Sequence, residues 1–298
     1  MRFVKVFHNP GAGEGAHSKE NLVEKIRAAG FDCSYSSTKK EIDEKRIPDK
    51  TDAIIVAGGD GSVGQLAGYL IDRKILSRRF RVGLLPSGTA NNIARTLGIE
   101  GSTDEIINRW KECNIKKFDV AKVHGINKKQ FFLEGLGFGV FPRLMKEMKA
   151  RTTKSDDPEE ELQTALKMLI SIINNYKSRP CKIRIDDMEY EGNFLMVEIM
   201  NIRSIGPNLN IAAGAQTDDG ELDVIIVTES QRGELALYIE NRLIFGKEET
   251  FFYTALKGKK VSVKWGGKLL HVDDELVSVE KYTRLDIEVF TDVLHFLV

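Results

Sequence analysis

Three glycine-rich loops in the first third of the sequence are the segments best suited to chemistry. They are Asn9-Pro10-Gly11-Ala12-Gly13, Gly58-Gly59-Asp60-Gly61-Ser62 and Pro86-Ser87-Gly88-Thr89. A glycine loop between a strand and a helix presents backbone N–H groups at the positive end of the helix dipole, which favours anions. One such loop is more often a simple tight turn. Three of them, each after an expected strand of one domain, indicate a nucleotide phosphate site.

Asp60 places a carboxylate inside the second loop. A carboxylate beside phosphates is repulsive unless a cation intervenes, so Asp60 predicts either Mg²⁺ or a proton-accepting role. The alternative is a capping aspartate that only orders the turn. The GxxxxGK[ST] pattern of Walker-type sites is absent, and GxGxxG does not occur with a flanking strand and an acidic partner.

Short apolar segments precede the three loops and must position them. We expect strands over 3–7, 52–57 and 81–85, and helices over about 18–29, 62–70 and 90–97. Strand, glycine loop and helix in repetition predict an open α/β domain. The first residues alternate like a strand rather than like a secretion signal, and no apolar run approaches the roughly 18 residues that span a bilayer.

The rest of the chain is rich in short β segments. We expect strands over 118–123, 130–134, 182–185, 189–200, 222–227, 260–265, 269–272, 285–290 and 293–297, with helices near 159–176 and 231–245. Turn signals such as Asp186-Asp187 separate several of them, which predicts an antiparallel β-sandwich.

The composition excludes several classes of protein. Lys plus Arg and Asp plus Glu both number 44, so the chain lacks the positive excess of a protein that coats nucleic acid, and we expect no nucleic-acid partner. Three distant Cys suggest neither a zinc knuckle nor a disulfide framework and favour a cytoplasmic location. The five His lack metal-binding spacing and are interpreted as structural or surface residues.

Six motifs in series resemble the diacylglycerol kinase catalytic-domain family of lipid kinases, which includes sphingosine and ceramide kinases. The three loops are similar to its NPxSG, GGDGTxNE and PxGTxNDxAR, the second extending to Gln65 and the third to Arg95. The remaining three motifs are Asp119-Val120-Ala121-Lys122-Val123, Asp219-Gly220-Glu221-Leu222-Asp223-Val224 and Asp273-Asp274-Glu275, similar to DxxKV, DGxLDV and DGE. The resemblance covers nearly the whole chain.

The resemblance implies a three-layer α/β ATP-binding domain over 1–117, as in NAD kinase, followed by a β-sandwich lipid-substrate domain over 118–288. A last strand over 289–298 can return to the first domain. It implies ATP and Mg²⁺ as cofactors. The residues implied to bind ATP are Asn9, Pro10, Gly11, Ala12, Gly13, Thr38, Gly59, Asp60, Gly61, Ser62, Val63, Gly64, Gln65, Thr89 and Arg95.

The resemblance also assigns the catalysis and a second cation. A carboxylate must remove the proton of the lipid hydroxyl, and Glu275 is the first candidate, with Asp273 second and Asp60 in the magnesium network. A solvated hairpin tip explains the same residues without catalysis. Asp219, with the backbone carbonyls of Gln216 and Glu221, resembles the ligands of a structural Mg²⁺.

The chain departs from the family pattern at several positions. Glu14 stands where many members have Lys, Asn92 replaces an Asp, and Gly64-Gln65 replaces Asn-Glu. Asp274 replaces a Gly, which would cost a turn that needs positive φ. These departures keep a second hypothesis open, a catalytically impaired nucleotide- or lipid-binding regulator. A soluble kinase similar to NAD kinase is a third.

Membrane contact is expected from the substrate class rather than from a span. Residues 141–151 combine apolar side chains with Arg143, Lys146, Lys149 and Arg151, as in basic amphipathic segments that lie on anionic lipid. A helix with an ordinary solvated face explains them equally well. We therefore expect a cytoplasmic protein that meets its lipid substrate at the inner membrane face, with a homodimer left open.

Overall fold

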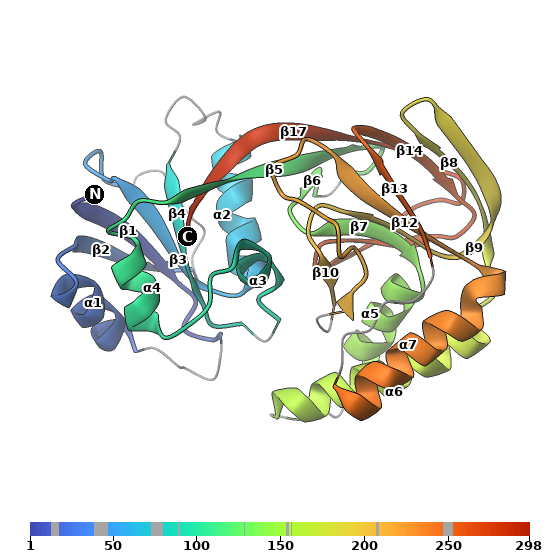
Figure 1. Cartoon of the computed structure of the whole chain (residues 1–298), viewed down its shortest axis with the longest axis horizontal. Coiled ribbons are helices and arrows are strands. Elements are labelled where there is room, and N and C mark those ends of the chain that lie inside the picture. Colours follow the sequence, from blue (N-terminus) through green and yellow to red (C-terminus); the bar gives the residue numbers. More distant parts are fainter. Residues whose placement is uncertain are drawn as a thin grey trace. The chain divides into compact units, whose positions relative to one another are not determined.

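The computed structural model describes residues 1–12, 18–38, 47–72, 80–88, 90–127, 129–152, 155, 157–206, 209–246 and 253–298. The chain divides into two compact units, one formed by Met1–Asp119 with Thr291–Val298 and the other by Val120–Phe290. The chain passes from one unit to the other within strands β5 (Ile115–His124) and β17 (Arg284–Leu297) (Figure 1). Because the end of β17 returns to the first unit, both chain ends belong to that unit.

A parallel sheet forms the centre of the first unit. Its strands are β1 (Phe3–His8), β2 (Asp32–Ser37), β3 (Ala53–Gly58) and β4 (Arg81–Pro86), in the order β2-β1-β3-β4. The end of β17 adds a fifth parallel strand beside β4, with Phe296 opposite Val82. Every residue of β3 is buried, because helices cover both faces of such a sheet.

Among the described residues of the first unit, four helices pack around this sheet. They are α1 (Lys19–Ala28), α2 (Asp60–Asp72), α3 (Asn92–Leu97) and α4 (Thr103–Arg109). Local sequence explains their starts: the Ser18 side chain accepts the N–H of Asn21, and Ser102 forms a capping box with Glu105. Helix α1 packs against α4, and α2 against α3.

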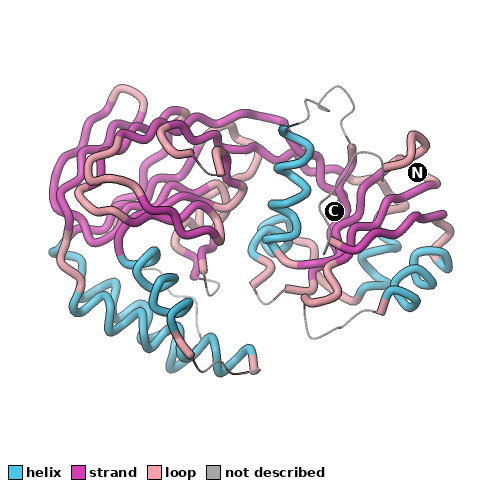
Figure 2. The backbone as a smooth tube through the Cα atoms, turned by 180° about the vertical axis from the view of Figure 1, so that it is seen from behind, coloured by secondary structure: helices cyan, strands magenta, loops and turns pink. Residues whose placement is uncertain are grey.

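The second unit is an antiparallel β-sandwich. Strands, drawn in magenta, make up most of it in Figure 2. Its strands are β6 (Phe131–Phe132), β7 (Gly135–Gly139), β8 (Arg179–Ile185), β9 (Met188–Met200), β12 (Leu222–Thr228), β13 (Thr254–Gly258), β14 (Lys260–Trp265), β15 (Leu269–Val272) and β16 (Glu275–Ser278), with a small hairpin of β10 (Ser204–Ile205) and β11 (Leu209–Asn210). The long strand β9 pairs with β7, β8 and β12.

In the described part of the second unit, three helices gather on one side of the sandwich (Figure 1). They are α5 (Val140–Ala150), α6 (Pro158–Asn175) and α7 (Arg232–Phe245), which follows a short 3₁₀ turn over Glu229–Gln231. Alternation along β9 divides the core between two layers. Val197 and Ile199 face the other strands of the sandwich, while Met196 and Met200 pack with the helices. Among the described helices, none is both long and apolar enough to cross a membrane.

The expected α/β domain followed by a β-sandwich is confirmed. Several individual elements differ from the expectation. Strands β7, β13 and β16 were not predicted, because glycines interrupt the first, and the other two are short segments flanked by charged residues. The last two expected strands are one, β17, which continues through Asp292 although that residue has a φ of 58°.

Candidate functional site

The three glycine loops meet at one edge of the first unit. The parallel strands β1, β3 and β4 all end there, at His8, Gly58 and Pro86. The N–H of Asn9 donates to the carbonyl of Ala57 at 2.8 Å, and the N–H of Ser87 to that of Gly58 at 3.2 Å. The strand order reverses direction between β1 and β3, and ligands of open α/β sheets bind at the carboxyl ends beside such a reversal.

Glycine is required where the second and third loops touch. A Cβ atom added to Gly88 would lie 2.6 Å from the Cα of Gly59, and one added to Gly59 would lie 3.0 Å from the Cα of Gly88. Asn91 fixes this contact, because its side chain accepts the N–H of Gly88 at 2.9 Å and donates to the carbonyl of Gly88 at 2.6 Å. The pair therefore keeps bare backbone at the edge of the sheet.

Asp60 begins α2 and reaches the third loop. Its carboxylate accepts the backbone N–H of Asn92 at 2.9 Å and that of Ile93 at 3.1 Å. The capping interpretation of Asp60 is therefore supported, although the helix that it caps is α3 and not its own. A carboxylate in this position also lies at the phosphate loops, so the magnesium role stays a prediction.

The other expected nucleotide-binding residues lie around this edge. The side chain of Asn9 accepts the N–H of Gly11 at 3.1 Å, and Thr38 donates its N–H to the carbonyl of His8 at 2.8 Å. Arg95 lies exposed on α3. Also at this edge are Pro10 and Ala12 in the first loop and Gly61, Ser62, Val63, Gly64 and Gln65 in the first two turns of α2. Gly13, Glu14 and Thr89 lie outside the described residues.

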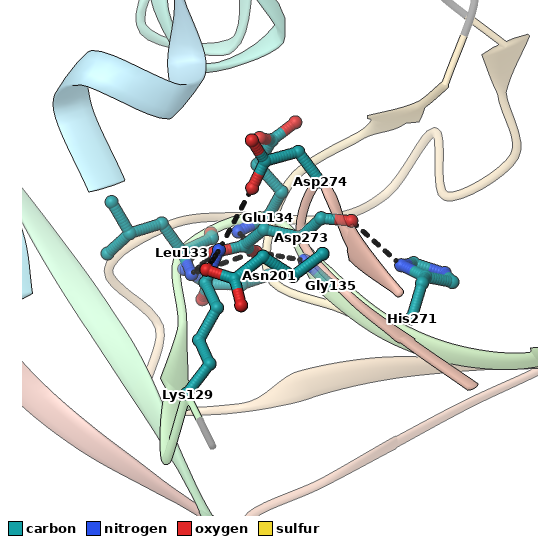
Figure 3. Close-up of polar contacts among 9 residues, drawn as sticks. Lys129, Leu133, Glu134, Gly135, Asn201, His271, Asp273 and Asp274 are labelled. Atoms are coloured by element: carbon teal, nitrogen blue, oxygen red, sulfur yellow. Dashed lines mark hydrogen bonds and ion pairs between the residues drawn. The ribbon is translucent and has the colours of Figure 1, made fainter. Parts of the chain in front are cut away.

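A second cluster lies in the sandwich, at the turn between β15 and β16 (Figure 3). The carboxylate of Asp273 accepts the backbone N–H groups of Leu133, Glu134 and Gly135 at 2.8 to 3.2 Å. Its side chain is 5% exposed. The carboxylate of Asp273 is therefore buried and occupied by backbone N–H groups, which makes Asp273 a poorer candidate base than Glu275.

Lys129 supplies the positive charge of this cluster. Its ammonium lies 3.4 Å from Asp273, 3.1 Å from Asp274 and 3.9 Å from Glu275. Burial lowers the pKa of Lys129, but the three carboxylates outweigh burial and hold that pKa above its usual value. Lys129 was missed by sequence reasoning because it lies far from the acidic turn along the chain.

Glu275 is the exposed member of the acidic turn. It is the first residue of β16 and pairs with Val272, and its side chain is 55% exposed. The expectation that Asp274 needs positive φ is wrong, because Asp273 has the positive value, 49°. Aspartate tolerates this conformation better than most residues do. Replacement of a family Gly by Asp274 therefore imposes no strain of that kind.

A buried acid–base pair adjoins the turn. Glu198 on β9 is fully buried and lies 2.8 Å from Nε2 of His271 on β15, which is 2% exposed. Burial raises the pKa of Glu198. His271 also contacts the backbone oxygen of Asp273 at 3.0 Å. A lone charged residue in the apolar run of β9 was the sequence signal for this pair.

The expected structural cation site is an acidic turn before β12. Asp219 accepts the N–H of Glu221 at 3.1 Å, and the ammonium of Lys257 lies 2.6 Å from Asp219 and 3.7 Å from Asp223. Burial raises the pKa of Asp223 to about 6. The described residues hold no group of three His, Cys, Asp or Glu side chains arranged around a metal. The expected cation site has one carboxylate and the backbone carbonyls of Gln216 and Glu221, so it would not be such a group. The expected site therefore stays a prediction.

The fold consists of an α/β domain with three glycine-rich loops at one edge of its sheet, followed by an antiparallel sandwich. Residues 4–123 match the model of the diacylglycerol kinase catalytic domain, and residues 147–280 match that of the YegS C-terminal NAD kinase beta sandwich-like domain. The two matches lie in successive parts of the chain and together span most of it. The chain therefore carries a diacylglycerol kinase catalytic domain followed by a YegS-type C-terminal β-sandwich domain.

Individual relatives agree with this assignment. A diacylglycerol kinase of Bacillus subtilis is 24% identical over 283 residues, which cover 88% of this chain and 86% of the relative. One from Staphylococcus haemolyticus is 24% identical over 243 residues, covering 78% and 69%. A solved structure of a candidate diacylglycerol kinase from Bacillus anthracis superposes with a TM-score of 0.75 at 26% identity, covering 99% and 97%.

Proposed function

We propose that the protein is a lipid kinase, which uses ATP and Mg²⁺ to phosphorylate the hydroxyl group of a diacylglycerol-like lipid. The observation that carries the proposal is the meeting of three glycine loops at the switch point of the first unit, in a chain that carries a diacylglycerol kinase catalytic domain. The names of the relatives supply the substrate class.

The first unit fits a nucleotide phosphate. Gly59 and Gly88 allow the backbones of the second and third loops to touch, and α2 begins at Asp60 with its positive dipole end toward the loops. The expected binding residues Asn9 to Gly13, Gly59 to Gln65 and Thr89 would contact the phosphates, and Arg95 would offset developing charge.

The acidic turns fit the roles of base and cation ligand. When bound, Mg²⁺ neutralises phosphate charge and draws on hard oxygen ligands. Asp219 and Asp223 both contact the ammonium of Lys257. This single positive charge does not balance two ionised carboxylates. Glu275, exposed and 3.9 Å from Lys129, would accept the proton of the lipid hydroxyl.

Phosphorylation of lipid in micelles tests the proposal. The protein is incubated with γ-labelled ATP, Mg²⁺ and a mixed lipid extract, and label in the organic phase is identified. Glu275→Gln should lower kcat by roughly 10² to 10⁴ with little change in the KM for ATP. Glu280→Gln is the matched control, because Glu280 is an exposed carboxylate of the same unit paired with Lys268. A wild type that binds ATP but labels no lipid would favour the regulator hypothesis.

Access to such a substrate requires contact with a lipid surface. Helix α5 presents exposed Arg143, Lys146 and Lys149 beside an apolar buried face, so it is our candidate for contact with anionic lipid. Sedimentation with vesicles containing phosphatidylglycerol, compared with neutral vesicles, measures this contact. Loss of binding in the triple substitution of these cations by Gln would support it.

A further inference from the structure

A single cross-strand row joins Glu198, Gly137 and His271. In the register of the sheet Gly137 on β7 pairs with Glu198 on one side and with His271 on the other. A Cβ atom added to Gly137 would lie 1.8 Å from the Glu198 carboxylate. The glycine thus leaves the gap through which Glu198 reaches across β7 to His271. The row belongs to the face on which Met196 and Met200 pack with the helices.

The contacts of His271 determine where one proton must be. A backbone carbonyl only accepts hydrogen bonds, so Nδ1 of His271, 3.0 Å from the oxygen of Asp273, carries a proton. One further proton then lies between Nε2 and Oε2 of Glu198, 2.8 Å apart. Whether imidazole or carboxyl group holds it, the pair is neutral overall and the Nδ1–H bond to Asp273 persists.

The acidic turn is therefore held at two points. The carboxylate of Asp273 is bound by three N–H groups of 133–135, and its own N–H donates to the carbonyl of Gly135 at 2.8 Å. These contacts fix the residue itself. The hydrogen bond from His271 fixes the carbonyl of Asp273. It therefore also fixes the plane of the peptide that joins Asp273 to Asp274, the residue before Glu275.

The cost of the pair points to a role beyond folding. Apolar residues of similar volume are often as stabilising as a buried ionisable pair, because desolvation offsets the attraction. The backbone contacts of Asp273 and the pairing of β15 with β16 already close the hairpin. What Glu198 and His271 add is a fixed orientation of the 273–274 peptide.

We propose that Glu198 and His271 are positioning residues for the lipid kinase reaction, which aim Glu275 through the carbonyl of Asp273. This inference rests on the proposed function, because Glu275 is the base only in that reaction. A displacement of about 1 Å at a catalytic group can cost on the order of 10²-fold in rate. Loss of the Nδ1–H bond is expected to act on kcat in this range.

Matched substitutions separate the effect of the Nδ1–H hydrogen bond from the effect of the size of the His271 side chain. In the conservative variant Glu198→Gln the new amide donates to neutral Nε2, so the Nδ1–H bond remains and kcat should fall by less than tenfold. In this background, His271→Asn keeps a donor near the position of Nδ1, whereas His271→Gln keeps a group near Nε2 only. We expect kcat for lipid to fall less than tenfold for Asn and roughly 10² for Gln, with the KM for ATP unchanged.

Two outcomes overturn the inference while leaving the proposed function standing. The first is an active wild type in which the Asn and Gln variants have equal kcat. The second is a ¹⁵N spectrum of histidine-labelled wild type, assigned by loss of the signal in His271→Asn, that shows unprotonated Nδ1 at pH 7.5. The spectrum of the wild type does not depend on activity. A wild type that phosphorylates no lipid overturns the proposed function and this inference with it.

Discussion

The Oδ2 atom of Asp60 accepts a hydrogen bond from the backbone N–H of Asn92 at 2.9 Å, although 32 residues separate the two. Helix α3 has no side-chain cap of its own, since Asn91 before it is left-handed with a φ of 51° and caps no N–H. Asp60 supplies the missing acceptor from the second glycine loop. The structure of the third loop thus depends on a carboxylate of the second.

Removal of this acceptor should destabilise the first unit. Asp60→Ala is expected to lower the free energy of unfolding by about 1–2 kcal/mol, the usual cost of a lost helix cap. Asp60→Asn keeps an acceptor and should lose less, while still weakening any Mg²⁺-dependent ATP binding. Urea denaturation measures the first effect, and exposed Asp32→Ala is the control. Equal stability of Asp60→Ala and wild type would contradict the capping role.

A side chain between the second and third loops should weaken ATP binding. Gly88→Ala places a Cβ atom 2.6 Å from the Cα of Gly59, so the two backbones must separate. We expect at least a tenfold rise in the Kd for Mg-ATP, measured by calorimetry. Gly233→Ala at an exposed position of α7 is the control, because its Cβ atom would meet no atom within 4 Å. Unchanged affinity in Gly88→Ala would remove this contact from the nucleotide site.

Lys129 should give the stability a characteristic dependence on alkaline pH. Its pKa is raised in the folded state, so its contribution is fully present below the unfolded value of 10.5 and is lost as the pH rises through the folded pKa. Lys129→Met should lower the free energy of unfolding by about 3 kcal/mol at pH 8, because it leaves the buried Asp273 carboxylate without its cation.

Denaturation at several pH values checks this prediction. The difference between wild type and Lys129→Met should shrink above pH 10.5. Lys268→Met, which removes an exposed ion pair with Glu280, should stay within about 0.5 kcal/mol of wild type throughout. A gap that widens at high pH would refute the assignment of the effect to the Lys129 ammonium.

Gly137 and Glu198 should be energetically coupled. Gly137→Ala forces its new Cβ atom onto the Glu198 carboxylate and is expected to cost about 3 kcal/mol or more. In a Glu198→Ala background the same change should cost much less, since the clashing atoms are gone. The double-mutant cycle measures this coupling by denaturation. Additive effects would show that Gly137 is needed for another reason.

The turn at Asp219 offers a test of the expected structural cation. If Mg²⁺ binds there, chelation should lower the Tm of wild type, and Asp219→Asn should remove the response. Lys257→Met should strengthen the response, because in the wild type the Lys257 ammonium competes with a cation for the carboxylates of Asp219 and Asp223. Identical chelator responses in wild type and Asp219→Asn would exclude a cation at this turn.

Sequence reasoning was most successful where the information is local. The glycine loops, the apolar strands before them and the helices near 159–176 and 231–245 depend on nearby residues, and the family assignment and fold class were confirmed. Reasoning was wrong about Asp274 because the φ of a two-residue turn depends on both flanking strands and on the contacts of Asp273. The assignments of individual nucleotide, base and cation residues remain predictions.

The sequence alone determined that this chain has an α/β domain with three glycine-rich loops, followed by a sandwich that contains the acidic turns at Asp219 and Asp273. Composition, periodicity and glycine placement act over a few residues, so they can be recognised along the chain. The tertiary structure alone decided which distant groups meet. It brought Asp60 to α3, Lys129 to Asp273, and Glu198 past Gly137 to His271. Such contacts depend on strand register and close packing, which no local pattern encodes.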